Sequence, residues 1–133
     1  MTAIIPAIGV IDHAAFNVLL ATDLPEVAAE IDDDDRALLH LEMATVARCT
    51  CRAIENNDAQ MVARYFDFID RVLSTAASEV ENAVYVSYLE NVFLWDERSE
   101  SLAARSKLPA RLQVALKDLE AHWASLADAS RKP

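Results

Sequence analysis

The sequence predicts an all-α single domain, and three observations carry this prediction. The chain has 133 residues with one glycine and four prolines, too few turn formers for a sheet built from tight hairpins. Hydrophobic residues make up 53% of the chain, which excludes a disordered tail. Apolar residues also recur at helical spacing in nearly every segment. We therefore expect an antiparallel helical bundle or a short helical solenoid of five to seven helices.

Helical periodicity and helix-start signals place each expected helix along residues 1–133, which we take as one domain. The acidic segment 1–35 precedes a helical core, 36–127, and the tail 128–133 is expected to fray. The expected helices are 10–21, a short helix with Pro25 in its first turn, 35–56, 58–76, 79–94, 98–105 and a last helix opened by Pro109.

Apolar stripes justify these helices in chain order. The stripe of the first helix is Ile11, Ala14, Ala15, Val18 and Leu19. That of the long third helix is Leu39, Met43, Val46, Ala47 and Ile54. That of the fourth is Val62, Tyr65, Phe66, Ile69, Val72 and Leu73. That of the last is Leu112, Ala115, Leu116, Leu119, Trp123 and Leu126.

The helix at 79–94 is apolar around most of its circumference, so we expect it at the centre of the fold. Tyr85, Leu89 and Val92 follow 3.6-residue spacing on this helix and are predicted to be buried.

The charge is uneven along the chain. The first 35 residues hold eight acids and no Lys or Arg, whereas residues 99–133 hold four acids and six bases. The formal net charge is −10. A charge of this sign disfavours nucleic acid and anionic membrane surfaces as partners. The opening residues lack the features of a signal peptide, and no apolar run is long enough for a membrane span. We expect a cytoplasmic protein.

The cysteines and histidines do not form a metal-binding pattern. Cys49 and Cys51 lie two positions apart on a predicted helix, so their thiols face opposite sides and cannot share a metal or a disulfide. The histidines, His13, His40 and His122, lack metal-ligand spacing. The cysteines are interpreted as structural residues of a reducing compartment.

Catalytic motifs are absent from the sequence. The chain contains no nucleophile elbow, phosphate loop or dinucleotide fingerprint. Acidic pairs such as Asp67 with Asp70 are better explained by a solvated helix face with local partners, Arg64 or Arg71. We expect neither an enzyme nor a bound cofactor.

The run Asp32, Asp33, Asp34 and Asp35 is the most one-sided stretch of the chain. Four adjacent aspartates repel one another, and a helix start needs only one or two carboxylates. A basic partner is the simplest reason for such a run. The alternative is a solvated loop that supplies one N-cap, Asp34 or Asp35. The same acidic segment adds Asp23, Glu26 and Glu30 as candidate binding residues.

A second candidate site is Trp95, Asp96 and Glu97, at the end of a predicted helix. A Trp flanked by acids is typical of an interface anchor. The alternative is that Trp95 closes the bottom of the core.

The stretch Glu79–Asn91 resembles a segment found in a family of small bacterial helical proteins. Asn82, Ser87, Leu89, Glu90 and Asn91 match that segment, while Tyr88 replaces the usual Phe. The likeness covers roughly residues 35–125. Such proteins look like immunity proteins of polymorphic, contact-dependent toxin systems.

We therefore expect an immunity protein whose partner is a cognate bacterial toxin domain. The acidic sites suit a basic nuclease, whose active site their carboxylates would occlude in place of phosphates. The alternative is a helical adaptor or scaffold that binds a peptide or helix through an apolar groove.

Overall fold

The computed structural model describes residues 10–35, 37–94 and 96–131. Its helices are α1 (His13–Asp23), α2 (Pro25–Ala28), α3 (Leu39–Glu55), α4 (Ala59–Ser74), α5 (Ser78–Ala83), α6 (Glu90–Val92), α7 (Ser99–Arg105) and α8 (Ala110–Arg131). A 3-10 turn lies at Asp33–Asp35, and a π-helical turn, Val84–Leu89, joins α5 to α6. With α5, the π turn and α6 counted as one helix, the described residues form seven helices and no strand. The all-α prediction is confirmed.

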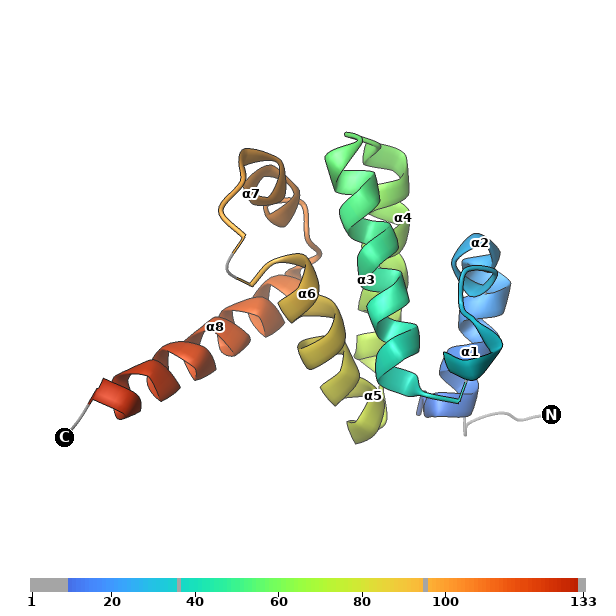
Figure 1. Cartoon of the computed structure of the whole chain (residues 1–133), viewed down its shortest axis with the longest axis horizontal. Coiled ribbons are helices and arrows are strands. Elements are labelled where there is room, and N and C mark those ends of the chain that lie inside the picture. Colours follow the sequence, from blue (N-terminus) through green and yellow to red (C-terminus); the bar gives the residue numbers. More distant parts are fainter. Residues whose placement is uncertain (1–9, 36, 95, 132–133) are drawn as a thin grey trace.

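Helix α3 lies at the centre of the fold (Figure 1). It packs against α2, α4, α7 and the continuous helix formed by α5, the π turn and α6. Helices α3 and α4 run antiparallel in the middle of the molecule, with α1 and α2 on one side and α5 and α6 on the other (Figure 1). Helix α8 runs obliquely to this arrangement, and its C-terminal half extends beyond the other helices (Figure 1).

The predicted apolar stripes form one continuous core. Its largest fully buried apolar side chains are Phe16, Leu20, Leu24, Met43, Phe66, Ile69, Tyr88, Leu89, Phe93, Leu112 and Leu116. Phe66 on α4 and Phe93 after α6 pack with ring centroids 5.9 Å apart, so these two layers interlock directly. Towards its C-terminal end α8 leaves the core: Trp123 is half-buried and Leu126 is exposed.

Single aspartates cap the starts of α1 and α4. The Asp12 carboxylate accepts a hydrogen bond from the Ala15 amide at 2.9 Å, and the Asp58 carboxylate accepts one from the Met61 amide at 3.2 Å. Each satisfies an amide that would otherwise lack a partner in the first helical turn. The segment before α1 is further fixed because the Ile11 amide donates to the Thr75 carbonyl at 2.8 Å.

The start of α3 differs from the prediction. The helix begins at Leu39 instead of near residue 35, and its N-cap, Leu38, makes no side-chain capping bond. The prediction that Asp34 or Asp35 caps this helix is wrong. Carboxylates three or four residues apart repel on a helix, and the aspartates form a separate 3-10 turn instead.

The π turn changes which side of the helix is buried. Val80, Val84, Tyr88 and Val92 are all buried at strict four-residue intervals. A pure 3.6-residue helix would rotate such a series away from the core, and the wider π turn offsets that rotation. Leu89 and Val92 are buried as predicted, but Tyr85 is only half-buried. The prediction for Tyr85 assumed a regular helix and is corrected.

The C-terminal boundary also differs from the prediction, since α8 continues through Arg131. No glycine or proline interrupts the sequence between Pro109 and Pro133, so no residue in that stretch breaks the helix. Among the described residues, no helix is both long and apolar enough to cross a membrane.

Candidate functional site

The sequence predicts Asp23 and Glu26 as partner-binding residues, but both are engaged within the fold. Arg71 binds the Asp23 carboxylate, with Nη1 and Oδ2 2.6 Å apart. Arg64 binds Glu26 with both terminal nitrogens, at 2.6 and 3.1 Å, and also donates to the Asp23 carbonyl at 2.8 Å. These pairs connect the α1–α2 corner to α4. The expected local pairing of Asp67 with Arg64 or Arg71 does not form, because both arginines reach across to these acids.

Glu30 is paired in the same way. Arg52 on α3 donates to both carboxylate oxygens of Glu30 at 3.1 Å. The Arg52 hydrogen bonds lower the pKa of Glu30 despite a smaller opposing effect of burial. The Cys49 thiol also donates to this carboxylate at 3.6 Å. Glu30 therefore fixes the chain to α3 just before the aspartate run.

Asp32, Asp33, Asp34 and Asp35 form a short surface turn, which we call the aspartate turn. Its first three side chains are exposed and Asp35 is half-buried. The Asp35 amide donates to the Asp32 carbonyl at 2.9 Å, and the Leu38 amide donates to the Asp35 carbonyl at 2.9 Å. These backbone bonds hold the turn in a defined shape, so its carboxylates occupy a small region between α2 and α3.

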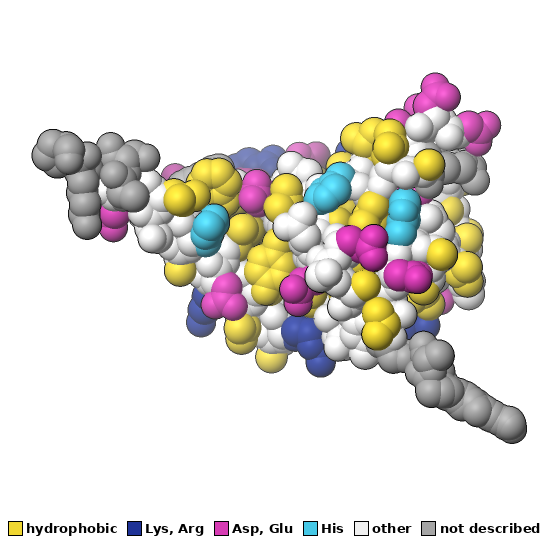
Figure 2. All heavy atoms as spheres, turned by 90° about the horizontal axis from the view of Figure 1, so that it is seen from below, with side chains coloured by type: hydrophobic (Ala, Val, Ile, Leu, Met, Phe, Trp, Pro, Cys, Tyr) yellow, Lys and Arg dark blue, Asp and Glu magenta, His cyan; other side chains and the backbone are white. Residues whose placement is uncertain are grey.

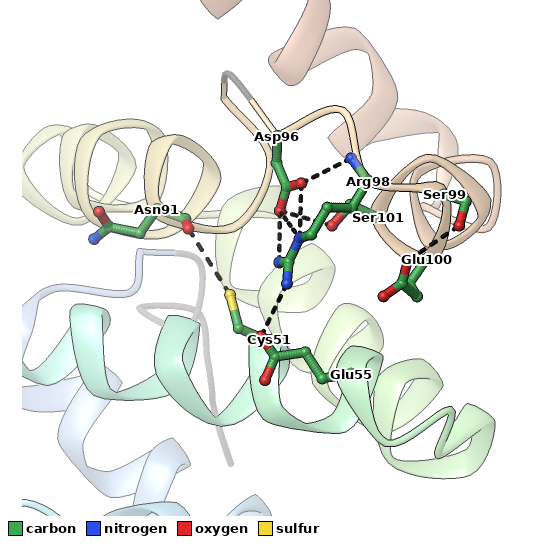
Figure 3. Close-up of polar contacts among 8 residues, drawn as sticks. All are labelled: Cys51, Glu55, Asn91, Asp96, Arg98, Ser99, Glu100 and Ser101. Carbon is green, nitrogen blue, oxygen red and sulfur yellow. Dashed lines mark hydrogen bonds and ion pairs between the residues drawn. The ribbon is translucent and has the colours of Figure 1, made fainter.

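Asp96, from the second predicted site, is mostly occupied by internal contacts (Figure 3). Its carboxylate accepts the backbone amide and the guanidinium of Arg98 at 2.8 to 3.3 Å, and the Ser101 hydroxyl at 2.8 Å. The Arg98 side chain, followed by the Arg98 amide and Ser101, holds the pKa of Asp96 far below its usual range. Arg98 also donates to Glu55 on α3 at 3.1 Å (Figure 3). Asp96 thus attaches the loop before α7 to α3.

The other two residues of that site have different outcomes. Glu97 is exposed and lines a groove between α7 and α8 of about 710 Å³. Trp95 lies outside the described residues. The structure therefore does not bring the nine described residues of the predicted sites together. Asp23, Glu26, Glu30 and Asp96 form ion pairs with arginines, whereas Asp32, Asp33, Asp34 and Glu97 are exposed.

A groove that the sequence did not predict lies between α8 and the continuous helix formed by α5, the π turn and α6. It has a volume of about 630 Å³. We call it the Trp123 groove, and its lining residues are Glu81, Asn82, Tyr85, Val86, Glu90, Asp118, Leu119, His122 and Trp123. The two walls diverge towards the lower side of the molecule in Figure 1. No local pattern in the sequence indicated this groove, because the course of α8 is a tertiary property.

The segment Glu79–Asn91, which resembles a family of small bacterial helical proteins, mainly connects helices. The Tyr88 hydroxyl shares a 2.9 Å hydrogen bond with Thr50, and Ser87 shares one of 2.6 Å with His40. Glu90 accepts the Trp123 indole N–H at 3.2 Å. These partners come from α3 and α8, so the polar residues of the segment position neighbouring helices.

The cysteines and histidines are likewise used in packing. Cys49 and Cys51 point to different neighbours, Glu30 and the Asn91 carbonyl, and both thiols are free. Burial, assisted by Glu30, raises the pKa of Cys49 to about 11, which makes it a poor nucleophile at neutral pH. Burial also raises the pKa of Cys51. Within the described residues, no group of three or more potential ligands could hold a metal ion.

One buried acid lacks a full set of partners. Glu42 is completely buried, and one of its oxygens lies 2.6 Å from His13 Nε2. Its second oxygen has no hydrogen-bond partner among the described residues. This pair joins α1 to α3.

Comparison with known proteins identifies a family and no activity. Residues 17–124 match a family model described as a domain of unknown function, DUF7674. The match spans most of the chain, so the protein belongs to this family. No curated protein and no solved structure matches the chain. The family description names no partner, so the likeness to immunity proteins stays a hypothesis.

Proposed function

We propose that this member of the DUF7674 family is an immunity protein that binds a basic toxin domain, in particular a nuclease, and neutralises it. The observation that carries the proposal is the aspartate turn, four consecutive carboxylates on a fixed surface turn between α2 and α3. A nuclease active site is built to accept phosphates, and carboxylates held close together can occupy it in their place. Such an inhibitor would act in the cytoplasm of the cell that makes the toxin.

The internal ion pairs give the aspartate turn a rigid support. Asp23 and Glu26 bind the α1–α2 corner to α4, and Glu30 binds the chain just before the turn to α3. A surface that is ordered before binding loses less conformational entropy when the partner arrives. We therefore assign these three acids to positioning and the four aspartates to the contact with the toxin.

Electrostatic steering supports the same assignment. The chain has 22 acids against 12 Lys and Arg, and eight of these acids lie in its first 35 residues. A concentrated negative charge speeds the capture of a basic partner, and the gain falls as salt screens it. Glu97, exposed beside the groove between α7 and α8, is a second candidate contact, and Trp95 beside it stays a sequence-based proposal.

The test begins with the gene directly upstream of this one. If it encodes a toxin, its C-terminal domain can be purified and its nuclease activity titrated with the protein. We expect loss of activity at an equimolar ratio, and weaker inhibition by the variant in which all four aspartates are Asn. Full nuclease activity in excess protein would contradict the proposal.

A second candidate function is a helical adaptor. It is favoured by a narrow cleft of about 180 Å³ between the α3–α4 end and α7. Seven of its eleven lining residues are apolar: Ile54, Ala59, Val62, Ala63, Phe66, Ala103 and Ala104. An adaptor that binds through apolar side chains would keep its affinity at high salt, whereas an acidic inhibitor would lose affinity.

A further inference from the structure

The Trp123 groove combines an apolar floor with an acidic rim. Tyr85, Val86, Leu119 and Trp123 supply the apolar surface, and Val86 is 42% exposed. Leu126, one helical turn beyond Trp123, is also exposed. Figure 2 shows the molecule from below, with hydrophobic, acidic and histidine side chains interspersed and Lys and Arg mainly at the margins. Exposed apolar surface rimmed by polar residues marks interaction sites.

The π turn is what opens this groove. The turn keeps Val84 and Tyr88 in the core, and Tyr85 then faces α8 from a half-buried position. Val86, the next residue, lines the groove from the same turn. π turns are rare and occur frequently at functional sites. In this chain the turn places an aromatic ring and an exposed valine on one wall of the groove.

The charges around the groove have one sign. Glu81, Glu90 and Asp118 are among its lining residues, and no Lys or Arg is. Within the described part of the chain, none of the three forms an ion pair with Lys or Arg. Burial raises the pKa of the Tyr85 phenol, and the nearby Asp118 and Glu81 carboxylates add to this rise. The phenol therefore lies in a negative potential.

We infer that the Trp123 groove binds an amphipathic helical segment of a partner protein, with apolar side chains on the floor and Lys or Arg against the acidic rim. Arg or Lys can also stack on the face of Tyr85. Charge complementarity favours this occupant over a second copy of the chain. A symmetric contact between two copies would place the same acids against each other, which is unfavourable. The inference does not depend on the partner being a toxin.

The test uses a fluorescein-labelled helical peptide with Leu on one face and Lys along both flanks. A second peptide replaces every Lys with Glu, and a third scrambles the Leu positions so that the apolar face is lost. Binding to the full chain is measured by fluorescence anisotropy at low and at high salt. We expect the Lys peptide to bind at least about tenfold more tightly than either control at low salt.

Two groove variants and one matched control locate the site. Glu81→Lys with Asp118→Lys reverses two rim charges, and Val86→Glu places a charge on the floor. The control, Asp67→Lys with Glu79→Lys, makes the same charge change at exposed acids outside the groove. We expect each groove variant to weaken binding of the Lys peptide by about tenfold or more, and the control by about twofold at most. Circular dichroism melts verify that each variant folds.

Three outcomes would overturn the inference. The Glu peptide could bind as tightly as the Lys peptide, or the groove variants could bind the Lys peptide like the wild type. The third is self-association in sedimentation experiments that Val86→Glu abolishes, since a second copy would then cover the groove. Replacement of the four aspartates of the aspartate turn with Asn should leave peptide binding within about threefold of the wild type. This variant therefore distinguishes a failure of the toxin proposal from a failure of the proposal that the Trp123 groove binds a helix.

Discussion

The α1–α2 corner and the Trp123 groove are both acidic, but they use their acids differently. At the corner, Asp23, Glu26 and Glu30 each bind an arginine from α3 or α4. Around the groove, Glu81 and Asp118 form no ion pair with Lys or Arg in the described part of the chain. An acid is available to a partner only where the fold does not supply a cation. The number of acids in a segment therefore does not by itself identify a binding surface.

The aspartate turn lies between these two cases. It follows the paired acids directly in the chain, yet its own carboxylates project from a turn with its own backbone bonds. Arg52 on α3 and Arg64 and Arg71 on α4 are engaged with the earlier acids. Exposed ion pairs contribute only about 0–1 kcal/mol each, so the corner pairs matter more for position than for stability. The predictions below test this division.

The largest expected effect is on the core that carries both regions. Leu89 is completely buried in the π turn, so Leu89→Ala should lower the free energy of unfolding by about 2–5 kcal/mol. Tyr85→Ala in the same turn should lower it less, because Tyr85 is half-buried against the groove. Urea titrations followed by circular dichroism measure both. A smaller loss for Leu89→Ala than for Tyr85→Ala would mean that the π turn faces the other way.

The next effect concerns association. Replacement of Asp32, Asp33, Asp34 and Asp35 together with Asn should lower the on-rate for a basic toxin domain by about tenfold or more at low salt. The difference in on-rate between the variant and the wild type should shrink as the salt concentration is raised. Stability should hold or rise, because mutually repelling carboxylates are removed. Stopped-flow association across a salt series, with thermal melts of the variant, tests both parts.

A matched pair of variants controls for total charge. Asp32→Asn with Asp34→Asn removes two charges from the aspartate turn, and Asp67→Asn with Glu79→Gln removes two from exposed positions elsewhere. Equal on-rates for the two would show that only net charge matters. A sharply lower melting temperature with an unchanged on-rate would make the turn a structural element, and the toxin contact would have to be sought elsewhere.

A smaller effect on stability is expected at Asp96, whose carboxylate is bound by groups within the fold. This effect should depend on pH. Its pKa is lowered in the folded state by Arg98 and Ser101, so its ionised form stabilises the fold. That stabilisation is full above the unfolded-state pKa of about 3.9 and is lost as the pH falls towards the folded-state value. Asp96→Asn should therefore cost about 1 kcal/mol at neutral pH.

The difference between the wild type and Asp96→Asn should narrow as the pH drops below about 4. Urea unfolding midpoints of both proteins, measured from neutral to acid pH, report this difference in stability. A difference that stays constant over this range would mean that the carboxylate charge of Asp96 does not contribute, and that the hydrogen bonds alone account for its role.

Helical periodicity was sufficient to predict most of the fold. The stripes on α3 and α4 are buried almost as expected, because an amphipathic helix has one face to bury. The position of Tyr85 was missed, since a π turn has no residue signature in the sequence. The partners of Asp23 and Glu26 were missed because Arg64 and Arg71 lie about forty positions away. The Trp123 groove depends on the direction of α8, which local patterns do not encode.

The smallest expected effect decides whether Glu26 belongs to the fold or to the interface. Glu26 binds Arg64 at the partly exposed α1–α2 corner, so Glu26→Gln should lower stability by about 0.2–1 kcal/mol at low salt. The loss should vanish near 1 M salt, where the Debye length is about 3 Å. Glu79→Gln is the control, because the described residues contain no ion-pair partner for this exposed α5 carboxylate, and it should change stability little at either salt concentration.

If Glu26→Gln instead leaves stability unchanged and slows association with a basic toxin, the sequence-based assignment of Glu26 to the interface would be right. Arg64 would then have to release Glu26 when the partner binds, and the corner would join the aspartate turn as a contact surface.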